Sequence, residues 1–171
     1  MKKKIIAILF VLLFIASIVW LIVEGSKSEV LPTGSKIPTI SFLTHNGSET
    51  ITETNNKTFI IFFSKDCPHC IYELKILNEN IERLGATKIY LLTADKDYLE
   101  NEEISSFSNL LNFKNATFGI VNKNDFEAKF GSMVLPTLYF FNTERKLIAK
   151  IKGETKFERI LKEIEMKQIK N

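Results

Sequence analysis

The chain has two cysteines, Cys67 and Cys70, and they enclose Pro68 and His69. A C-x-x-C pair suits thiol–disulfide exchange, because one thiolate attacks a disulfide and the second thiol resolves the resulting mixed disulfide. Two cysteines among 171 residues are too few for a cysteine-rich scaffold or for a four-thiolate metal site. The spacing therefore predicts a redox-active dithiol.

The pair lies between two predicted elements that would position it. The continuous apolar run at 59–63 (FIIFF) predicts a buried central strand, and the periodicity of 68–84 predicts an amphipathic helix that ends at Gly85. Cys67 then falls at the helix N-terminus, where unpaired N–H groups and the helix dipole favour a thiolate. Cys70 follows on the same side, within disulfide reach. We expect Cys67 to attack and Cys70 to resolve.

The residues around the pair act in opposite directions on the stability of a Cys67 thiolate. A partly protonated His69 beside Cys67 would favour the thiolate and make the disulfide more oxidising. Lys65 adds to this effect and Asp66 opposes it, so the sequence alone does not give the direction of their combined effect on the thiolate. The alternatives to a redox-active pair are inert buried cysteines, a permanent structural disulfide and half of a zinc site. We predict neither a metal nor a cofactor, since no second cysteine pair exists and His45 and His69 are the only histidines.

The rest of the chain alternates predicted strands and helices. Asn46-Gly47 predicts a hairpin over 39–52. Further strands are expected at 89–92, 117–121, 137–141 and 146–152, and further helices at 101–111, 124–130 and around 157–164. In 146–152, Leu147, Ala149 and Ile151 alternate with Ile148, Lys150 and Lys152, which predicts one wet face. The order β-β-β-α-β-α-β-α-β-β-α predicts an α/β domain with a mixed sheet.

The N-terminus carries a membrane signal. Lys2, Lys3 and Lys4 precede nineteen uncharged residues, Ile5 to Val23. Such a run is about 28 Å long as a helix, close to the roughly 30 Å hydrocarbon core. It predicts a single-pass anchor over 1–23 with a cytoplasmic N-terminus, an extracytoplasmic linker at 24–36 and a domain at 37–171. A cleaved signal peptide is the alternative, although no small-x-small site follows the run.

The net charge of +3 belongs to this signal. Without Lys2, Lys3 and Lys4, 20 of the 23 basic residues remain against 20 acidic ones, and the net charge is zero. We therefore predict no nucleic-acid partner.

The strand, the C-x-x-C, the helix and a later Leu135-Pro136-Thr137 entering a strand resemble the thioredoxin-like superfamily. This resemblance implies that Pro136 is cis beside the dithiol and that the Leu135 backbone pairs with an extended substrate segment. A trans proline at a strand start is the alternative.

Within the superfamily, about residues 37–168 are most similar to the membrane-anchored TlpA/ResA-like group. The anchor, the hairpin, the stretch FGSMVLPTLYFFNTERKLIAKIKG and the 66 positions from Cys70 to Pro136 carry this likeness, which implies one extra strand–helix insertion. The string FFSKDCPHC resembles DsbA instead, whose active site is also CPHC. Two departures matter: Ile61 stands where many such proteins have a buried acid, and Asp66 where they often have a tryptophan.

The expected function is an extracytoplasmic thiol–disulfide oxidoreductase, periplasmic if an outer membrane exists, with a membrane or periplasmic electron donor and protein thiols or disulfides as substrates. The TlpA/ResA resemblance implies a reductant, as in cytochrome c maturation or disulfide repair, whereas CPHC points to an oxidant; we favour the reductant. The alternatives are a DsbA-like oxidase, a peroxiredoxin-type peroxidase and a non-enzymatic binding module. For the peroxidase motif P-x-x-x-[ST]-x-x-C, Ser64 and Cys67 fit but Ile60 stands at the proline position.

Overall fold

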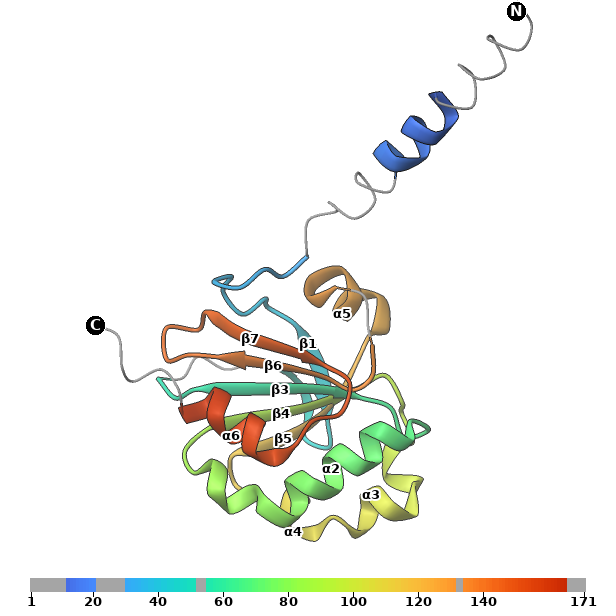
Figure 1. Ribbon diagram of the computed structural model, residues 1–171. Coiled ribbons are helices and arrows are strands. Elements are labelled where there is room, and N and C mark those ends of the chain that lie inside the picture. Colours follow the sequence, from blue (N-terminus) through green and yellow to red (C-terminus); the bar gives the residue numbers. More distant parts are fainter. Residues whose placement is uncertain (1–11, 21–29, 52–54, 132–133, 166–171) are drawn as a thin grey trace, which may run out of the picture.

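A seven-stranded mixed sheet organises the domain in a computed structural model that describes residues 12–20, 30–51, 55–131 and 134–165 (Figure 1). Its strands are β1 (Ser41–Thr44), β2 (Gly47–Thr50), β3 (Thr58–Phe63), β4 (Lys88–Thr93), β5 (Ala116–Val121), β6 (Thr137–Phe141) and β7 (Leu147–Lys152). Their spatial order is β2-β1-β5-β4-β3-β6-β7. The pairs β3·β4 and β4·β5 are parallel and the other pairs are antiparallel, which confirms the predicted α/β fold with a mixed sheet.

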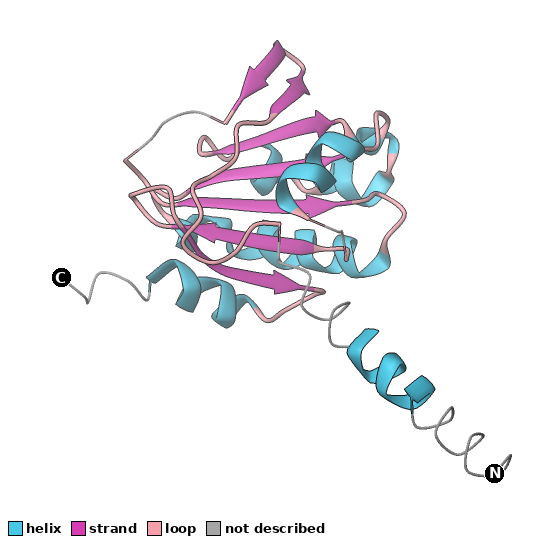
Figure 2. Ribbon diagram, turned by 90° about the horizontal axis from the view of Figure 1, so that it is seen from above, coloured by secondary structure: helices cyan, strands magenta, loops and turns pink. Residues whose placement is uncertain are grey.

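Helices cover both faces of this sheet (Figures 1 and 2). One face is covered by α2 (Pro68–Asn80) with its continuation, the 3-10 helix η1 (Ile81–Leu84), and by α3 (Glu102–Ser106), α4 (Ser108–Leu111) and α6 (Phe157–Glu165). The other face is covered by α5 (Lys123–Phe130). A short 3-10 helix, η2 (Tyr98–Glu100), follows β4. Two strand–helix units, β4 with α3 and α4 and then β5 with α5, therefore stand between α2 and β6.

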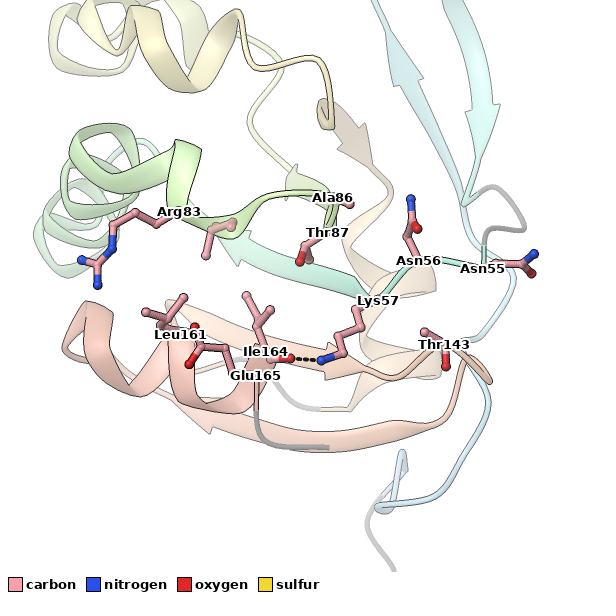
Figure 3. Close-up of a pocket in the computed structure, with 11 residues that line it drawn as sticks. Asn55, Asn56, Lys57, Arg83, Ala86, Thr87, Thr143, Leu161, Ile164 and Glu165 are labelled. Carbon is pink, nitrogen blue, oxygen red and sulfur yellow. Dashed lines mark hydrogen bonds between the residues drawn. The ribbon is translucent and has the colours of Figure 1, made fainter. Parts of the chain in front are cut away.

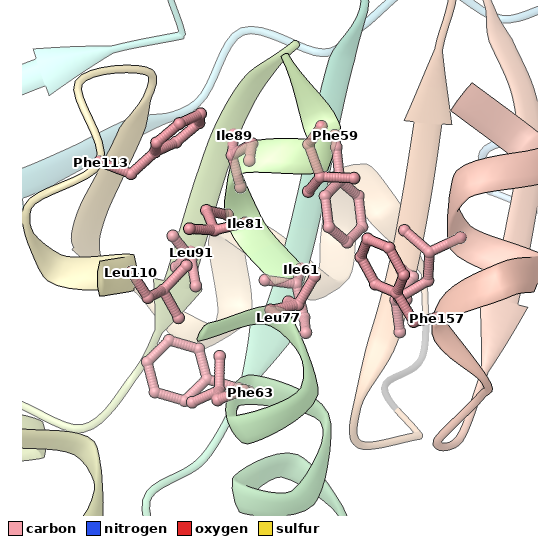
Figure 4. Close-up of a cluster of buried hydrophobic side chains, with 14 of the residues drawn as sticks. Phe59, Ile61, Phe63, Leu77, Ile81, Ile89, Leu91, Leu110, Phe113 and Phe157 are labelled. Atoms are coloured by element: carbon pink, nitrogen blue, oxygen red, sulfur yellow. The ribbon is translucent and has the colours of Figure 1, made fainter. Parts of the chain in front are cut away.

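Strand β3 is buried along its whole length, as its apolar run predicts. Phe59, Ile61 and Phe63 point into the core under α2 and α6 (Figure 4), while Ile60 and Phe62 point into the core under α5. Phe59 stacks on a phenylalanine of β6 with ring centroids 4.9 Å apart, and Phe62 stacks on one of α5 at 4.3 Å. This central strand is therefore held on both sides, which gives the residues that follow it a rigid base.

The predicted helix over 101–111 is two helices, and this expectation was wrong. It breaks at Phe107, whose ψ of 62° is not helical and whose side chain enters the core. The hydroxyls of Ser105 and Ser106 donate to the carbonyls of the preceding turn, which competes with the regular helix. The side chain of Asn78 then accepts from the Leu110 N–H and supports the second helix.

Two strand details also differ from the prediction. The hairpin turn is His45-Asn46, one residue earlier than predicted, because Gly47 pairs with Thr44 and takes the positive φ of 117°. In β7 a bulge at Ile148 changes the expected alternation.

The bulge appears in the register, because Phe140 pairs with Ala149 but Phe141 pairs with Leu147. The extra residue turns Leu147 into the core under α5, while Ile151 stays in the core under α2. The prediction that Leu147 and Ile151 share one face is therefore wrong.

The second half of the predicted linker packs on the domain. Leu31 is 4% exposed, the Gly34 N–H donates to the Leu147 carbonyl at 2.8 Å, and the Leu147 N–H donates to the Ser35 carbonyl at 2.8 Å. Glycine and proline make a turn here that lays residues 31–36 beside the edge strand, rather than a free tether. Residues 31–36, which were assigned to the linker, thus pack on the domain, while 24–29 lie outside the described residues.

The predicted anchor lies mostly outside the described residues, which include 12–20 as a helix but neither 1–11 nor 21–29. Of the helices in the described part of the chain, none has the length and apolar character needed to span a bilayer.

Candidate active site

The C-x-x-C motif lies where β3 ends and α2 begins. Cys67 is the N-cap of α2 with extended backbone angles, its sulfur accepts a hydrogen bond from the Cys70 N–H at 3.2 Å, and Pro68 occupies the first helical turn. Both cysteines are free thiols; Cys67 is partly exposed and Cys70 is fully buried. Cys67 is thus the more accessible of the two sulfurs, and its role as the attacking thiol stays a prediction.

Burial keeps Cys70 in its thiol form. It raises the pKa of Cys70 far above the ordinary value, and the hydrogen bond with Cys67 and the charge of Asp95 raise it further, while the Ser64 backbone opposes the shift. Cys70 therefore needs a change at Cys67, or a proton acceptor, before it can react as a thiolate.

The cis-proline expected from the resemblance is present. The Leu135–Pro136 peptide bond is cis, and Pro136 precedes β6, whose first residue, Thr137, pairs with Phe62 of β3. This register brings Pro136 to the end of the strand that leads into the C-x-x-C. Leu135 is partly exposed and packs against both hydrophobic cores. Its pairing with substrate stays a prediction.

A set of polar contacts holds the loop in front of Cys67. The Asp95 Oδ2 atom accepts from the Ser64 hydroxyl and from the Lys65 N–H, both at 2.8 Å. Lys65 forms an ion pair with Asp97 at 2.7 Å, and the Asn101 side chain donates to the Lys65 carbonyl at 3.1 Å. The segment after β4 therefore holds the loop that precedes Cys67. In this chain that loop has Asp66 at the position where related proteins often have a tryptophan.

His69 is directed to an acidic residue that sequence analysis missed. Its Nδ1 atom lies 2.8 Å from Glu154 Oε2, in the loop between β7 and α6, and both side chains are exposed. In this geometry the partner of the imidazole is a carboxylate, and its effect on Cys67 stays a prediction. The two residues are 85 positions apart, so no local pattern indicated the pair.

Glu73 is a second functional candidate that sequence analysis missed. It lies one helical turn after Cys70, is completely buried, and accepts from the Thr155 N–H at 2.8 Å through Oε2, while Oε1 has no hydrogen-bond partner. Burial raises the pKa of Glu73 to about 7; the Glu154 charge adds to the shift and the Thr155 bond reduces it. The signal in the sequence is its place on the buried face of the helix, between Cys70 and Leu77.

Two hollows lie at opposite ends of the sheet. One of about 170 Å³ adjoins the dithiol loop and is lined in part by Ser64, Asp95 and Leu135. The other, of about 420 Å³, surrounds Lys57, whose ammonium donates to the Ile164 carbonyl (Figure 3). Because Lys57 precedes β3 and Cys67 follows it, this larger hollow is remote from the redox chemistry. Within the described ranges, no cluster of His, Cys, Asp or Glu has the arrangement of a metal site.

We expect Asp95→Ala to lower the free energy of unfolding by about 2 kcal/mol, since hydrogen bonds to a charged group contribute roughly 1.5–3 kcal/mol. Urea unfolding of the full chain in detergent, followed by circular dichroism, measures this. Asp125→Ala is the control, because Asp125 makes a surface ion pair with Lys129 on α5 and its removal should cost under about 1 kcal/mol. Equal losses in the two variants would mean that Asp95 does not hold the loop.

A central strand that leads into C-x-x-C at a helix N-terminus, with a cis-proline loop beside it, defines the thioredoxin-like class. The chain belongs to the thioredoxin-like domain family, whose model matches residues 44–168. A search among curated proteins finds no match.

Solved structures share this fold. A peroxiredoxin-like protein from Aquifex aeolicus is 18% identical with a TM-score of 0.63, over 80% of this chain and 87% of that one. The thioredoxin domain of a thiol-disulfide oxidoreductase from Bacteroides vulgatus is 19% identical with a TM-score of 0.58, over 78% and 99%. StoA from Bacillus subtilis is 19% identical with a TM-score of 0.52, over 75% and 98%.

Proposed function

We propose that this protein is a thiol–disulfide oxidoreductase that exchanges disulfides with protein substrates through Cys67 and Cys70. The observation that carries the proposal is the pairing of a reachable thiol at a helix N-cap with a buried thiol one turn later, beside a cis-proline. Membership of the thioredoxin-like family and the similarity to a thiol-disulfide oxidoreductase from Bacteroides vulgatus support it.

In the reducing direction, the Cys67 thiolate attacks one sulfur of a substrate disulfide. A Cys67–substrate disulfide forms and the other substrate sulfur leaves as a thiolate. Cys70 then loses its proton and attacks the Cys67 sulfur, which forms the Cys67–Cys70 disulfide and releases the second substrate thiolate. The substrate gains two electrons, and an external dithiol donor must return them to the protein.

The site geometry favours a reductant. The carboxylate of Asp95 lies close enough to Cys70 to raise its pKa, and negative charge there disfavours a thiolate and so favours the disulfide form. His69, which would favour the thiolate, is engaged by Glu154. A peroxidase is less well supported, because Ile60 is buried in β3 at the position where that motif needs proline.

The proposed setting is a membrane surface. The segment 1–23 anchors the protein with its N-terminus in the cytoplasm, and the domain works outside, with protein thiols or disulfides as substrates and a membrane or periplasmic electron donor. The apolar run after Lys2, Lys3 and Lys4 supports this proposal.

The reduction potential tests both the activity and its direction. The full chain in detergent is equilibrated with glutathione and dithiothreitol buffers, and the Cys67–Cys70 disulfide is quantified after acid quenching. We expect a value nearer the roughly −270 mV of thioredoxin than the roughly −120 mV of DsbA. A value near that of DsbA would contradict the reductant assignment, and failure to form a Cys67–Cys70 disulfide in any buffer would contradict the oxidoreductase assignment.

A further inference from the structure

Three consecutive residues between β7 and α6 each contact a different part of the proposed active site. The Gly153 N–H donates to the Pro136 carbonyl at 2.8 Å, Glu154 contacts His69 at 2.8 Å, and the Thr155 N–H donates to Glu73 at 2.8 Å. The segment 153–155 thus connects the cis-proline loop with the helix that carries both cysteines. Glu154 is the member of the three that acts through its side chain.

We propose that Glu154 is a positioning residue that sets the reduction potential of the Cys67–Cys70 pair by holding His69. This inference rests on the proposed function, because it requires the two cysteines to cycle between dithiol and disulfide. Under this inference His69 of the CPHC motif does not make the disulfide more oxidising, which is the effect that its residue type alone indicates.

The placement of His69 explains why its partner matters. His69 lies in the first turn of α2, two residues after the N-cap Cys67, and its side chain is 68% exposed, so its contact with Glu154 decides where the ring points. An imidazolium bonded to a carboxylate has its charge compensated, and it stabilises a nearby thiolate less than an unpaired imidazolium does. Glu154 therefore reduces the stabilisation that His69 would give to a Cys67 thiolate.

The backbone contacts on either side of Glu154 make it a stable partner. Gly153 and Thr155 are tied to Pro136 and to the buried Glu73, so the Glu154 backbone is fixed next to α2 at both neighbours. The side chain then needs little ordering to reach His69, which lowers the entropic cost of an exposed ion pair. The buried Glu73 also interacts with the charge of Glu154.

The test is the reduction potential of Glu154→Gln, measured on the full chain in detergent at pH 6. Glutamine removes the negative charge that holds His69 and frees the ring to turn toward Cys67. We expect the equilibrium constant with glutathione to move about tenfold toward the reduced protein, which makes the potential about 30 mV less negative.

The double variant separates positioning from simple charge. In a His69→Ala background, Glu154→Gln should change the equilibrium constant by less than about twofold, because no imidazole remains to be released. Glu158→Gln, an exposed site in the first turn of α6, is the matched control and should leave the potential unchanged. An unchanged potential in Glu154→Gln, or an equal shift with and without His69, would overturn the inference.

These outcomes are distinct from a failure of the proposed function. If the unaltered chain forms no Cys67–Cys70 disulfide in any redox buffer, the oxidoreductase assignment fails and the Glu154 inference falls with it. If the unaltered chain equilibrates but Glu154→Gln behaves as the parent does, only the inference about Glu154 fails.

Discussion

Cys70→Ser should accumulate mixed disulfides between Cys67 and substrate proteins, on the order of tenfold more than Cys67→Ser does. The reason is the difference in access, because Cys67 is partly exposed at the N-cap whereas Cys70 is fully buried with a raised pKa. Without Cys70, the intermediate formed at Cys67 has no neighbouring thiol to release it. The measurement is acid quenching of cells that express the full-length variant, followed by non-reducing electrophoresis and mass spectrometry of the adducts.

The serine pair also provides its own control. Both substitutions remove one thiol from the same helical turn, so a general loss of folding would lower the adducts of both variants together. The double variant Cys67→Ser/Cys70→Ser gives the background of nonspecific bands. Adducts that form equally through Cys70 in Cys67→Ser would reverse the roles assigned to the two cysteines.

The ionisation of Glu73 should make the protein less stable as the pH rises from about 4.5 to about 7. Its pKa is about 7 in the folded protein and near 4.5 in an unfolded chain, so between these values the folded state holds a proton that the unfolded state has lost. The contribution of Glu73 to the free energy of unfolding is therefore fully present below about pH 4.5 and is lost as the pH rises to about 7. The difference in pKa corresponds to about 3 kcal/mol of unfolding free energy.

Glu73→Gln should remove this dependence. The amide cannot ionise, and its oxygen can still accept from the Thr155 N–H, so the variant should exceed the parent in stability at pH 8 by up to about 3 kcal/mol and by much less at pH 5. Urea unfolding at pH 5, 6, 7 and 8 gives the difference curve. Glu79→Gln, an exposed position on the same helix, is the control. A constant offset between Glu73→Gln and the parent at all four pH values would show that Glu73 does not titrate in this range.

The sequence was sufficient for features that depend on neighbours along the chain. The burial of β3 follows from its apolar run, the N-cap position of Cys67 follows from a strand next to an amphipathic helix, and the cis form of Pro136 follows from the family resemblance. The order of strands and helices was also predicted correctly, apart from the division of the helix at 101–111 into α3 and α4. For the strand and the N-cap, the residues that carry the signal lie within one element or at its boundary, whereas the cis form of Pro136 was implied by the resemblance.

Only the tertiary structure decided what surrounds the dithiol. His69 meets Glu154 across 85 positions, Glu73 meets Thr155 across 82, and Ser64 meets Asp95 across 31. Polar pairs of this kind depend on how loops from separate strands meet at one end of the sheet, and neither hydrophobic periodicity nor residue spacing records that meeting. The sequence by itself therefore determined which sulfur atoms can react, whereas the fold determined which charges lie beside them, because electrostatic effects act through space and not along the chain.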